Sequence, residues 1–333
     1  MSCNILILSA GRRVELINCF KNAAKKLNVD SKIVAADLSE FAPAIYFADC
    51  YYLIPRIGKD GYLESIIDIC NKENISLVIP TIDTELLFLA ESKNQIEEQS
   101  NAKVMVSDLK AISICRNKIA TQKFFEENAF GVPKMYTKED VERDEVEYPI
   151  FIKPLDGSSS INAFKVNNAK EAEFFVNYIN KPMIQECIVG EEYTVDVFCD
   201  FDSNPITIVP RRRIATRSGE IAKGQISRDH AIIEDVKRLI SVLKPIGHIT
   251  VQCMKTEKGI QYIEINPRFG GGAPMAVMSG ADSCENLYRL LRGEKLEYYE
   301  NYQDKQIFLR FDSCIQLNED FTKVETNDKN CFI

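Results

Sequence analysis

The sequence of 333 residues lacks several features that mark common functional classes. It has no excess of positive charge, because 41 Lys and Arg are outnumbered by 49 Asp and Glu and the net charge is −8. Nucleic acids and anionic membranes attract basic patches, so we expect neither as a partner. No run of roughly 18 apolar residues is present, and the N-terminus lacks the basic and apolar segments of a signal peptide. We therefore expect a cytoplasmic protein.

Metal-binding and nucleophilic motifs built on cysteine and histidine are also missing. The eleven cysteines include no C-x-x-C pair, which is typical of reduced, mostly buried cysteines rather than of a zinc site. The histidines are His230 and His248, and neither has the neighbours of a nucleophilic dyad. We assign catalysis to neither histidine.

Residues 1–108 alternate short apolar runs with segments of helical periodicity. Strands are expected at residues 4–8, 32–36 and 77–80, which predicts a parallel, doubly wound sheet with ligands outside the carboxyl ends of its strands. The loop after the first strand has a single glycine in place of G-x-G-x-x-G, so a dinucleotide site is disfavoured. Both ligand contacts and structural caps remain open for five residues at strand ends: Gly11, Arg12, Asp37, Asp83 and Glu85.

A polar hairpin is the most informative segment of the second half. Two β-rich runs flank residues 256–259, and a turn centred near Lys258 sets Gln252 directly opposite Glu264. Asn266 lies on the same face as Glu264, two residues along the strand. Such oxygen donors suit Mg²⁺, which takes one or two carboxylates and completes its shell with water and phosphate. A half-solvated strand face shows the same alternation, so the hairpin by itself leaves both interpretations open.

Arg268 follows Asn266 by two residues, and its permanently charged fork suits a phosphoryl group or a developing oxyanion. The segment E-I-N-P-R, with an amide twelve residues before its glutamate, resembles the metal-binding segment of the ATP-grasp superfamily. It is most similar to the carbamoyl phosphate synthetase large subunit and to biotin carboxylase.

This resemblance implies an α/β and α+β architecture. A Rossmann-like pre-ATP-grasp domain would span residues 1–108 and precede a two-lobed ATP-grasp domain. The small lobe, with a loop that covers the nucleotide, would span residues 109–187, and the large lobe with the metal site would span 188–312. Residues 313–333 would form a polar, frayed C-terminal tail after a strand at 306–311.

The resemblance also implies the nucleotide site. Lys118, at a helix start before G-V-P, and Lys153, in a strand that ends K-P, match the two lysines that reach the phosphates. The small-residue loop after Lys153 would close over phosphate oxygens, with Gly157, Ser158, Ser159 and Ser160. In the hinge, adenine would be held by Gln185, Glu186 and Ile188, and ribose by Glu192.

A dense basic cluster, residues 211–213 with Arg217 and Lys223, favours contact with phosphate or substrate over a solvated strand face. Arg213 is our catalytic candidate there, beside Arg268. The individual roles of Arg211, Arg212, Arg217 and Lys223 are not assigned.

The implied cofactors are ATP and Mg²⁺, with Mn²⁺ as an alternative metal. The implied reaction phosphorylates a small carboxylate to an acyl phosphate and joins it to an amine, with amino-acid-like substrates. Two alternatives stay open: a carbamoyl phosphate synthetase-like enzyme, which is disfavoured because no internal repeat is seen, and a regulatory ATP-binding protein without turnover. The carboxylate, the amine and the oligomeric state, for which a homodimer is one candidate, are not determined by the sequence.

Overall fold

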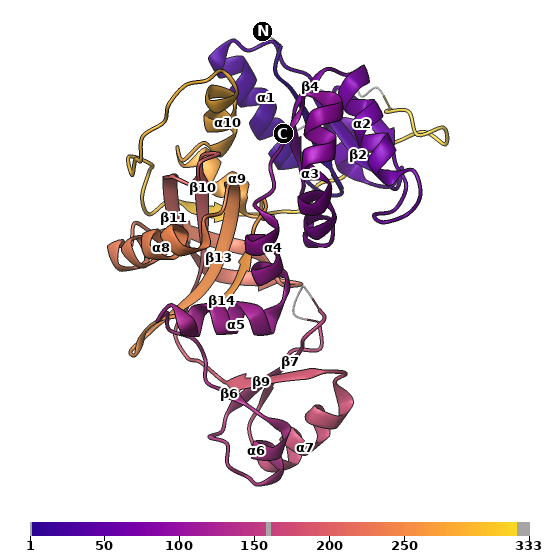
Figure 1. Ribbon diagram of the computed structural model, residues 1–333. Coiled ribbons are helices and arrows are strands. Elements are labelled where there is room, and N and C mark those ends of the chain that lie inside the picture. Colours follow the sequence, from indigo (N-terminus) through magenta and orange to yellow (C-terminus); the bar gives the residue numbers. More distant parts are fainter. Residues whose placement is uncertain (1, 158–160, 325–333) are drawn as a thin grey trace.

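The computed structural model describes residues 2–157 and 161–324, and its three β-sheets follow one another along the chain (Figure 1). The first is a five-stranded parallel sheet in the order β3-β2-β1-β4-β5. Its strands are β1 (Asn4–Leu8), β2 (Ile33–Asp37), β3 (Cys50–Leu53), β4 (Ile75–Ile79) and β5 (Lys103–Val104). The predicted parallel, doubly wound sheet is therefore confirmed.

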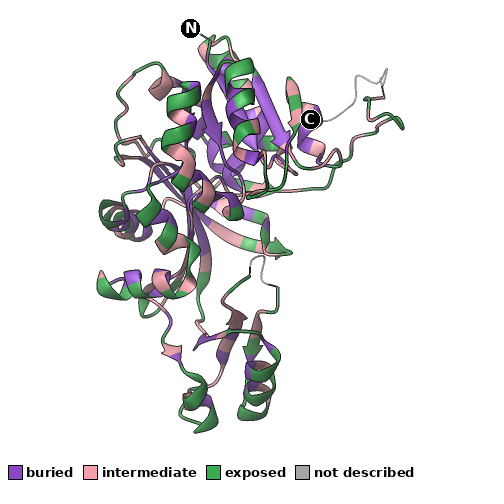
Figure 2. Ribbon diagram, turned by 45° about the vertical axis from the view of Figure 1, so that its right-hand side comes forward, coloured by how far each residue is buried: buried purple, intermediate pink, exposed green. Residues whose placement is uncertain are grey.

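Helices cover both faces of this sheet because successive strand residues point to opposite sides. Ile5 and Ile7 pack with α1 (Val14–Leu27), whereas Leu6 and Leu8 pack with α2 (Tyr62–Lys72) and α3 (Leu86–Ser100). Two short 3₁₀ turns, η1 (Pro43–Phe47) and η2 (Asp83–Glu85), follow strands β2 and β4. In Figure 2 the central strands β1, β2 and β4 are largely buried, whereas the edge strand β3 is partly exposed.

The second sheet is small and antiparallel, in the order β6-β9-β7-β8. It is reached through α4 (Leu109–Arg116) and α5 (Lys118–Glu127), and it forms a lobe that projects from the rest of the molecule at the bottom of Figure 1. Its strands are β6 (Met135–Tyr136), β7 (Ile150–Pro154), β8 (Phe164–Val166) and β9 (Pro182–Glu186). One face carries α6 (Lys138–Glu142) and α7 (Ala169–Tyr178), which share a small core with the strands.

The third sheet has six antiparallel strands in the order β14-β13-β10-β11-β12-β15. These are β10 (Glu191–Cys199), β11 (Pro205–Arg217), β12 (Glu220–Ile226), β13 (Gly247–Thr256), β14 (Gly259–Asn266) and β15 (Ile307–Leu309). One face packs on α8 (His230–Leu243) through apolar residues such as Val195, Ile240 and Val251. The antiparallel ATP-grasp-like half expected from the sequence is thus observed.

Two further helices join the third sheet to the first domain. After β14 the chain forms α9 (Ala273–Met278) and α10 (Ser283–Leu291), and α10 packs against α1. Phe20 of α1 meets Tyr288 of α10 and Phe269 edge-on, with ring centroids 6.1 and 6.0 Å apart. A continuous apolar core therefore ties the N-terminal sheet to the end of the polar hairpin.

The expectation of a frayed tail is wrong for residues 313–324. Leu317 and Phe321 pack against the N-terminal core, and the Phe321 ring lies 5.3 Å from that of Phe41. The expectation failed because apolar residues are few in this stretch, and their partners in the N-terminal core are far away in the sequence. All three sheets fall within the residue ranges predicted for the domain and the two lobes, whose limits remain predictions.

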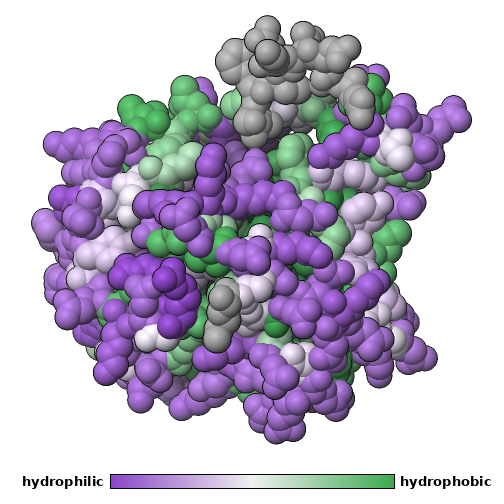
Figure 3. Space-filling view, turned by 90° about the horizontal axis from the view of Figure 1, so that it is seen from above, coloured by the Kyte–Doolittle hydropathy of each residue, from purple (hydrophilic) through white to green (hydrophobic). Residues whose placement is uncertain are grey.

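Seen from above, the surface is mainly hydrophilic, with hydrophobic side chains in small separate groups (Figure 3). Within residues 2–157 and 161–324, no helix combines the length and the apolar character needed to cross a membrane.

Candidate functional site

The polar hairpin has the predicted register. Gln252 pairs with Glu264, and Thr250 pairs with Asn266. The turn itself is tighter than expected, because Thr256 pairs with Gly259 and leaves two residues between them, with Gly259 at a φ of 103°. A β-bulge at Ile263 lies between the turn and the Gln252–Glu264 pair. It adds one residue to the second strand and so restores the predicted register.

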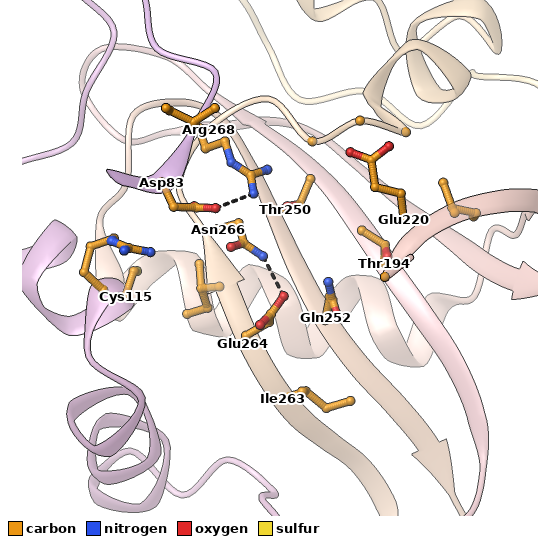
Figure 4. Close-up of a pocket in the computed structure, with 18 of the residues that line it drawn as sticks. Asp83, Cys115, Thr194, Glu220, Thr250, Gln252, Ile263, Glu264, Asn266 and Arg268 are labelled. Carbon is orange, nitrogen blue, oxygen red and sulfur yellow. Dashed lines mark hydrogen bonds and ion pairs between the residues drawn. The ribbon is translucent and has the colours of Figure 1, made fainter. Parts of the chain in front are cut away.

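Gln252, Glu264 and Asn266 lie together on the open face of the sheet (Figure 4). The Asn266 side-chain amide donates to Glu264 Oε1 over 2.9 Å, which leaves its own carbonyl oxygen for other partners. One carboxylate and two amide oxygens are the hard donors that a magnesium ion with phosphate ligands requires. The donor set therefore fits a divalent cation.

Arg268 connects this face to the N-terminal domain. Its Nη2 donates to Asp83 Oδ2 over 2.6 Å, and its Nη1 donates to the carbonyl of Phe269 over 3.2 Å (Figure 4). Asp83 lies at the carboxyl end of β4, which is the edge where ligands of parallel sheets bind. Of the two options left open for Asp83, a role at the site is therefore favoured over a structural cap.

Two cavities meet at the hairpin. The larger has a volume of about 590 Å³ and lies between the hairpin and the N-terminal domain. The smaller has a volume of about 400 Å³ and lies between the hairpin and the small lobe. They share a wall formed by Lys118, Gly157, Arg213, Gly219, Gln252, Ile263 and Glu264.

The smaller cavity brings together the residues that the sequence assigned to a nucleotide. They are Lys118, Lys153, Gly157, Gln185, Glu186, Ile188 and Glu192, while Ser158, Ser159 and Ser160 lie outside the described residues. Apolar side chains complete the cavity: Phe151, Ile161, Ala163, Met254 and Ile263. Such a mixture suits a flat aromatic base with a charged tail.

The two lysines lie close to the shared wall. Lys118 Nζ donates to the carbonyls of Pro154 and Gly157 over 2.7 and 3.0 Å, and so it holds the loop that follows β7. Burial lowers the pKa of Lys153 to about 8, an effect that the neighbouring charge of Lys118 increases and that of Glu264 opposes. Lys153 is thus a half-buried cation, and no ion pair joins it to a carboxylate within residues 2–157 and 161–324.

The side chains of Gln185 and Glu186, in the hinge, contact other residues of the protein. The buried side chain of Gln185 donates to Gln122 Oε1 over 3.1 Å, and Glu186 accepts from Lys258 Nζ over 3.0 Å. The bond from Lys258 also holds the pKa of Glu186 below its usual range. Both residues line the cavity, and their role in holding adenine stays a prediction.

Glu192 and Arg213 face each other at the shared wall. Arg213 Nη1 lies 3.2 Å from Glu192 Oε1, and Arg213 Nη2 donates to the carbonyl of Gly219 over 2.9 Å. Gly219 belongs to the turn between β11 and β12, so Arg213 also fixes that turn over the two cavities.

The larger cavity contains residues that the sequence did not assign. Among them are Arg13, Thr194, Arg211 and Glu220. Alternation along β11 was a usable signal, because side chains two apart share a face, so Arg211 accompanies Arg213 into the site. Arg212 points the other way and pairs with Glu191 over 3.0 Å.

Two domain models match the chain: the PylC-like N-terminal domain over residues 5–107 and the ATP-grasp domain over residues 115–272. These matches identify an ATP-grasp domain that follows a PylC-like N-terminal domain. The family resemblance and the fold class predicted from the sequence are confirmed.

Individual relatives are distant. The chain is 21% identical over 294 residues to the carbamoyl-phosphate synthase of Methanobrevibacter smithii, covering 80% of this chain and 78% of that protein. It is 35% identical to the D-alanine–D-alanine ligase of Fusobacterium nucleatum, but only over 106 residues, which cover 32% of this chain and 36% of the ligase.

Solved structures share the fold. The MgADP- and bicarbonate-bound biotin carboxylase domain dimer of the Hydrogenobacter thermophilus 2-oxoglutarate carboxylase has a TM-score of 0.71 at 19% identity, covering 92% of this chain and 73% of that one. The L-amino acid ligase of Bacillus licheniformis has a TM-score of 0.67 at 16% identity, covering 87% and 74%.

Proposed function

We propose that this protein is an ADP-forming carboxylate-amine ligase that uses ATP and Mg²⁺. It activates a small carboxylate as an acyl phosphate and transfers the acyl group to an amine, with amino-acid-like substrates. The observation that carries this proposal is the pair of cavities that meet at Gln252 and Glu264. A nucleotide in the smaller cavity and a carboxylate in the larger cavity would meet and react at the shared wall.

The smaller cavity is the nucleotide side of the proposal. Its apolar side chains, such as Met254 and Phe151, suit adenine, and Lys153 and Lys118 suit the phosphates. Lys153 supports this assignment most strongly, because partial burial disfavours its charge in the free protein and a bound phosphate would stabilise that charge. The backbone of the hinge is also available for adenine.

The shared wall is the proposed place of phosphoryl transfer. Glu264, Gln252 and Asn266 would hold the metal, which would neutralise negative charge on the phosphates. Arg268, fixed by Asp83, and Arg213, fixed by Glu192, would stabilise the transferring phosphoryl group. Phosphoryl transfer depends mainly on positioning and charge neutralisation, and these contacts supply both.

A regulatory ATP-binding protein is the second candidate, since the fold alone does not fix turnover. The larger cavity favours the ligase, because a protein that only binds nucleotide has no need of a second, charged cavity beside the phosphates. A carbamoyl-phosphate synthase is one of the relatives, and its alignment covers most of this chain. A homodimer and a cytoplasmic location remain expectations.

The decisive experiment is an ADP-release assay over a matrix of carboxylates and amines, including L- and D-amino acids. A ligase releases ADP at full rate only when both substrates are present, whereas a regulatory protein shows no substrate-dependent release. Mass spectrometry of the active wells identifies the amide product. Nucleotide binding without turnover in any combination would favour the regulatory protein.

A further inference from the structure

The floor of the larger cavity is a row of polar side chains that crosses four adjacent strands. Glu264 pairs with Gln252, Gln252 with Thr194, and Thr194 with Arg211. Paired residues of neighbouring strands point to the same face, and strands are spaced about 4.8 Å apart. Arg211 therefore begins about 10 Å from Gln252, beyond the residues proposed to hold the metal.

Arg211 is fixed almost completely by other residues. Its side chain is 2% exposed, and Nε and Nη2 donate to the two oxygens of Asp196 over 2.9 and 3.3 Å. Asp196 is in turn 3.5 Å from His248, whose Nδ1 lies 2.9 Å from Ser283 Oγ. His248 also stacks on Phe269, with ring centroids 4.3 Å apart.

The third nitrogen of this guanidinium has no hydrogen-bond partner among the residues that the structure describes. Arg211 Nη1 is buried, and Arg211 lines the larger cavity. A buried donor without an acceptor is costly, and more so when it is charged. Because Asp196 sets the orientation of the guanidinium, Nη1 is a preorganised donor for an anion.

A second arginine lies along the same backbone segment. A Cβ atom on Gly272 would fall 2.6 Å from Arg211 Nη1, and one on Gly271 would fall 2.8 Å from Arg13 Nη1. Arg13 makes two long polar contacts with described residues, 3.5 Å to Glu220 and 3.5 Å to the carbonyl of Thr81. Glycines at 271 and 272 thus let two guanidinium groups approach the same strip of backbone.

We propose that Arg211 and Arg13 bind the carboxylate of an α-amino acid that serves as the amine donor. This inference rests on the proposed ligase function and names the substrate class of the larger cavity. The carboxylate that is phosphorylated must lie beside the metal ligands and Arg268. An anion bound at Arg211 is therefore a second carboxylate, that of the amine donor. Asp196 and His248 are positioning residues, since they act through Arg211.

The test compares amino acids with the same compounds as carboxamides, which keep the amine and lose the negative charge. Binding is measured by thermal-shift and calorimetric titration, with and without Mg²⁺ and a non-hydrolysable ATP analogue. We expect the best-binding free amino acid to bind ten- to a hundredfold more tightly than its amide, as about 1.5–3 kcal/mol for a charged hydrogen bond implies.

Two variants test the arginines separately. Gly272→Ala keeps every charge but forces the Arg211 guanidinium to move, and the backbone φ of −97° accommodates alanine. Arg13→Met removes one charge and leaves Glu220 paired with Arg310 at 3.0 Å. The control is Arg212→Met, which removes an arginine from the opposite face of the same strand. Both test variants should lose most of the preference for the free acid, and the control should keep it.

The wild-type protein alone can overturn the proposal. It would do so by binding a free amino acid and its carboxamide with equal affinity, or by binding no amino acid. An undiminished preference in Gly272→Ala would also overturn it. Nucleotide affinity, measured in the same titrations, separates this failure from that of the ligase proposal. If nucleotide fails to bind, the ligase is wrong, and the nucleotide-free titrations still decide whether the carboxylate subsite exists.

Discussion

Lys153 is the residue whose chemistry depends most on pH. Its ordinary pKa is near 10.5, and burial lowers it to about 8. In the free protein the ammonium is therefore fully present well below pH 8 and is lost as pH rises through that value. A bound triphosphate favours the charged form and raises the pKa again.

We predict that ATP binding at pH 8 takes up protons and that ATP affinity falls above pH 8. The measurement is calorimetric titration in buffers of different ionisation enthalpy, repeated between pH 7 and 9. Lys153→Arg keeps its charge throughout this range, so its affinity should depend less on pH and its proton uptake should be smaller. Lys153→Ala should bind ATP on the order of ten- to a hundredfold more weakly. Unchanged affinity in the alanine variant would show that the nucleotide lies elsewhere.

At the residue scale, the sequence predicted positions better than partners. Glu264 and Asn266 were placed correctly on one face because strand alternation is a local rule. The partner of Gln185 was not predictable in this way, since Gln122 is 63 residues away in the chain. Arg211 was left unassigned because its buried partner, Asp196, comes from a neighbouring strand.

At the scale of elements, the register of the hairpin depends on a contact outside it. The Tyr262 amide donates to the carbonyl of Gly131 over 2.8 Å, directly before the bulge at Ile263. Without the extra residue, the two-residue turn would pair Gln252 with Ile263, and Glu264 would face the other side. The predicted pairing was confirmed, but the bulge that produces it was not predicted.

We predict that Gly131→Ala destabilises this region and weakens nucleotide binding. An added Cβ would lie 2.2 Å from the carbonyl oxygen of Ile260, so the loop or the strand has to move. Overpacking of this kind typically costs about 1–3 kcal/mol. Thermal unfolding and ATP titration provide the measurement, with Glu257→Ala at the exposed hairpin turn as the control. A variant that matches wild type in both would contradict the role of Gly131 in setting the register.

On the scale of the whole molecule, ion pairs join the N-terminal domain to the ATP-grasp half at the larger cavity. Asp83 meets Arg268 from one side, and Glu220 lies between Arg13 and Arg310 on the other. The architecture was predictable because sheet class follows from periodicity and the family motifs occur in order. The ion pairs could not be predicted, because they depend on how the N-terminal domain packs against the ATP-grasp half.

We predict that Asp83→Asn slows turnover and leaves ATP affinity nearly unchanged. The substitution removes the charge that orients Arg268, while the proposed adenine site and Lys153 belong to the smaller cavity, which Asp83 does not line. Steady-state kinetics should show a lower kcat, on the order of tenfold or more, because a transition-state contact is misplaced. Equal kcat values for the variant and the wild-type enzyme would mean that Arg268 does not act on the phosphoryl group.

The proposed magnesium-dependent transfer across the shared wall is tested most directly by the initial rate of ADP release as a function of free Mg²⁺. With the substrate pair from the screening matrix, Glu264→Gln should abolish turnover and keep much of the ATP affinity. Asn266→Ala should need more Mg²⁺ than wild type, and Gln252→Glu should need less, because it adds a charged oxygen donor for a hard cation. An active Glu264→Gln enzyme with an unaltered Mg²⁺ curve would contradict the metal site and, with it, the proposed place of phosphoryl transfer.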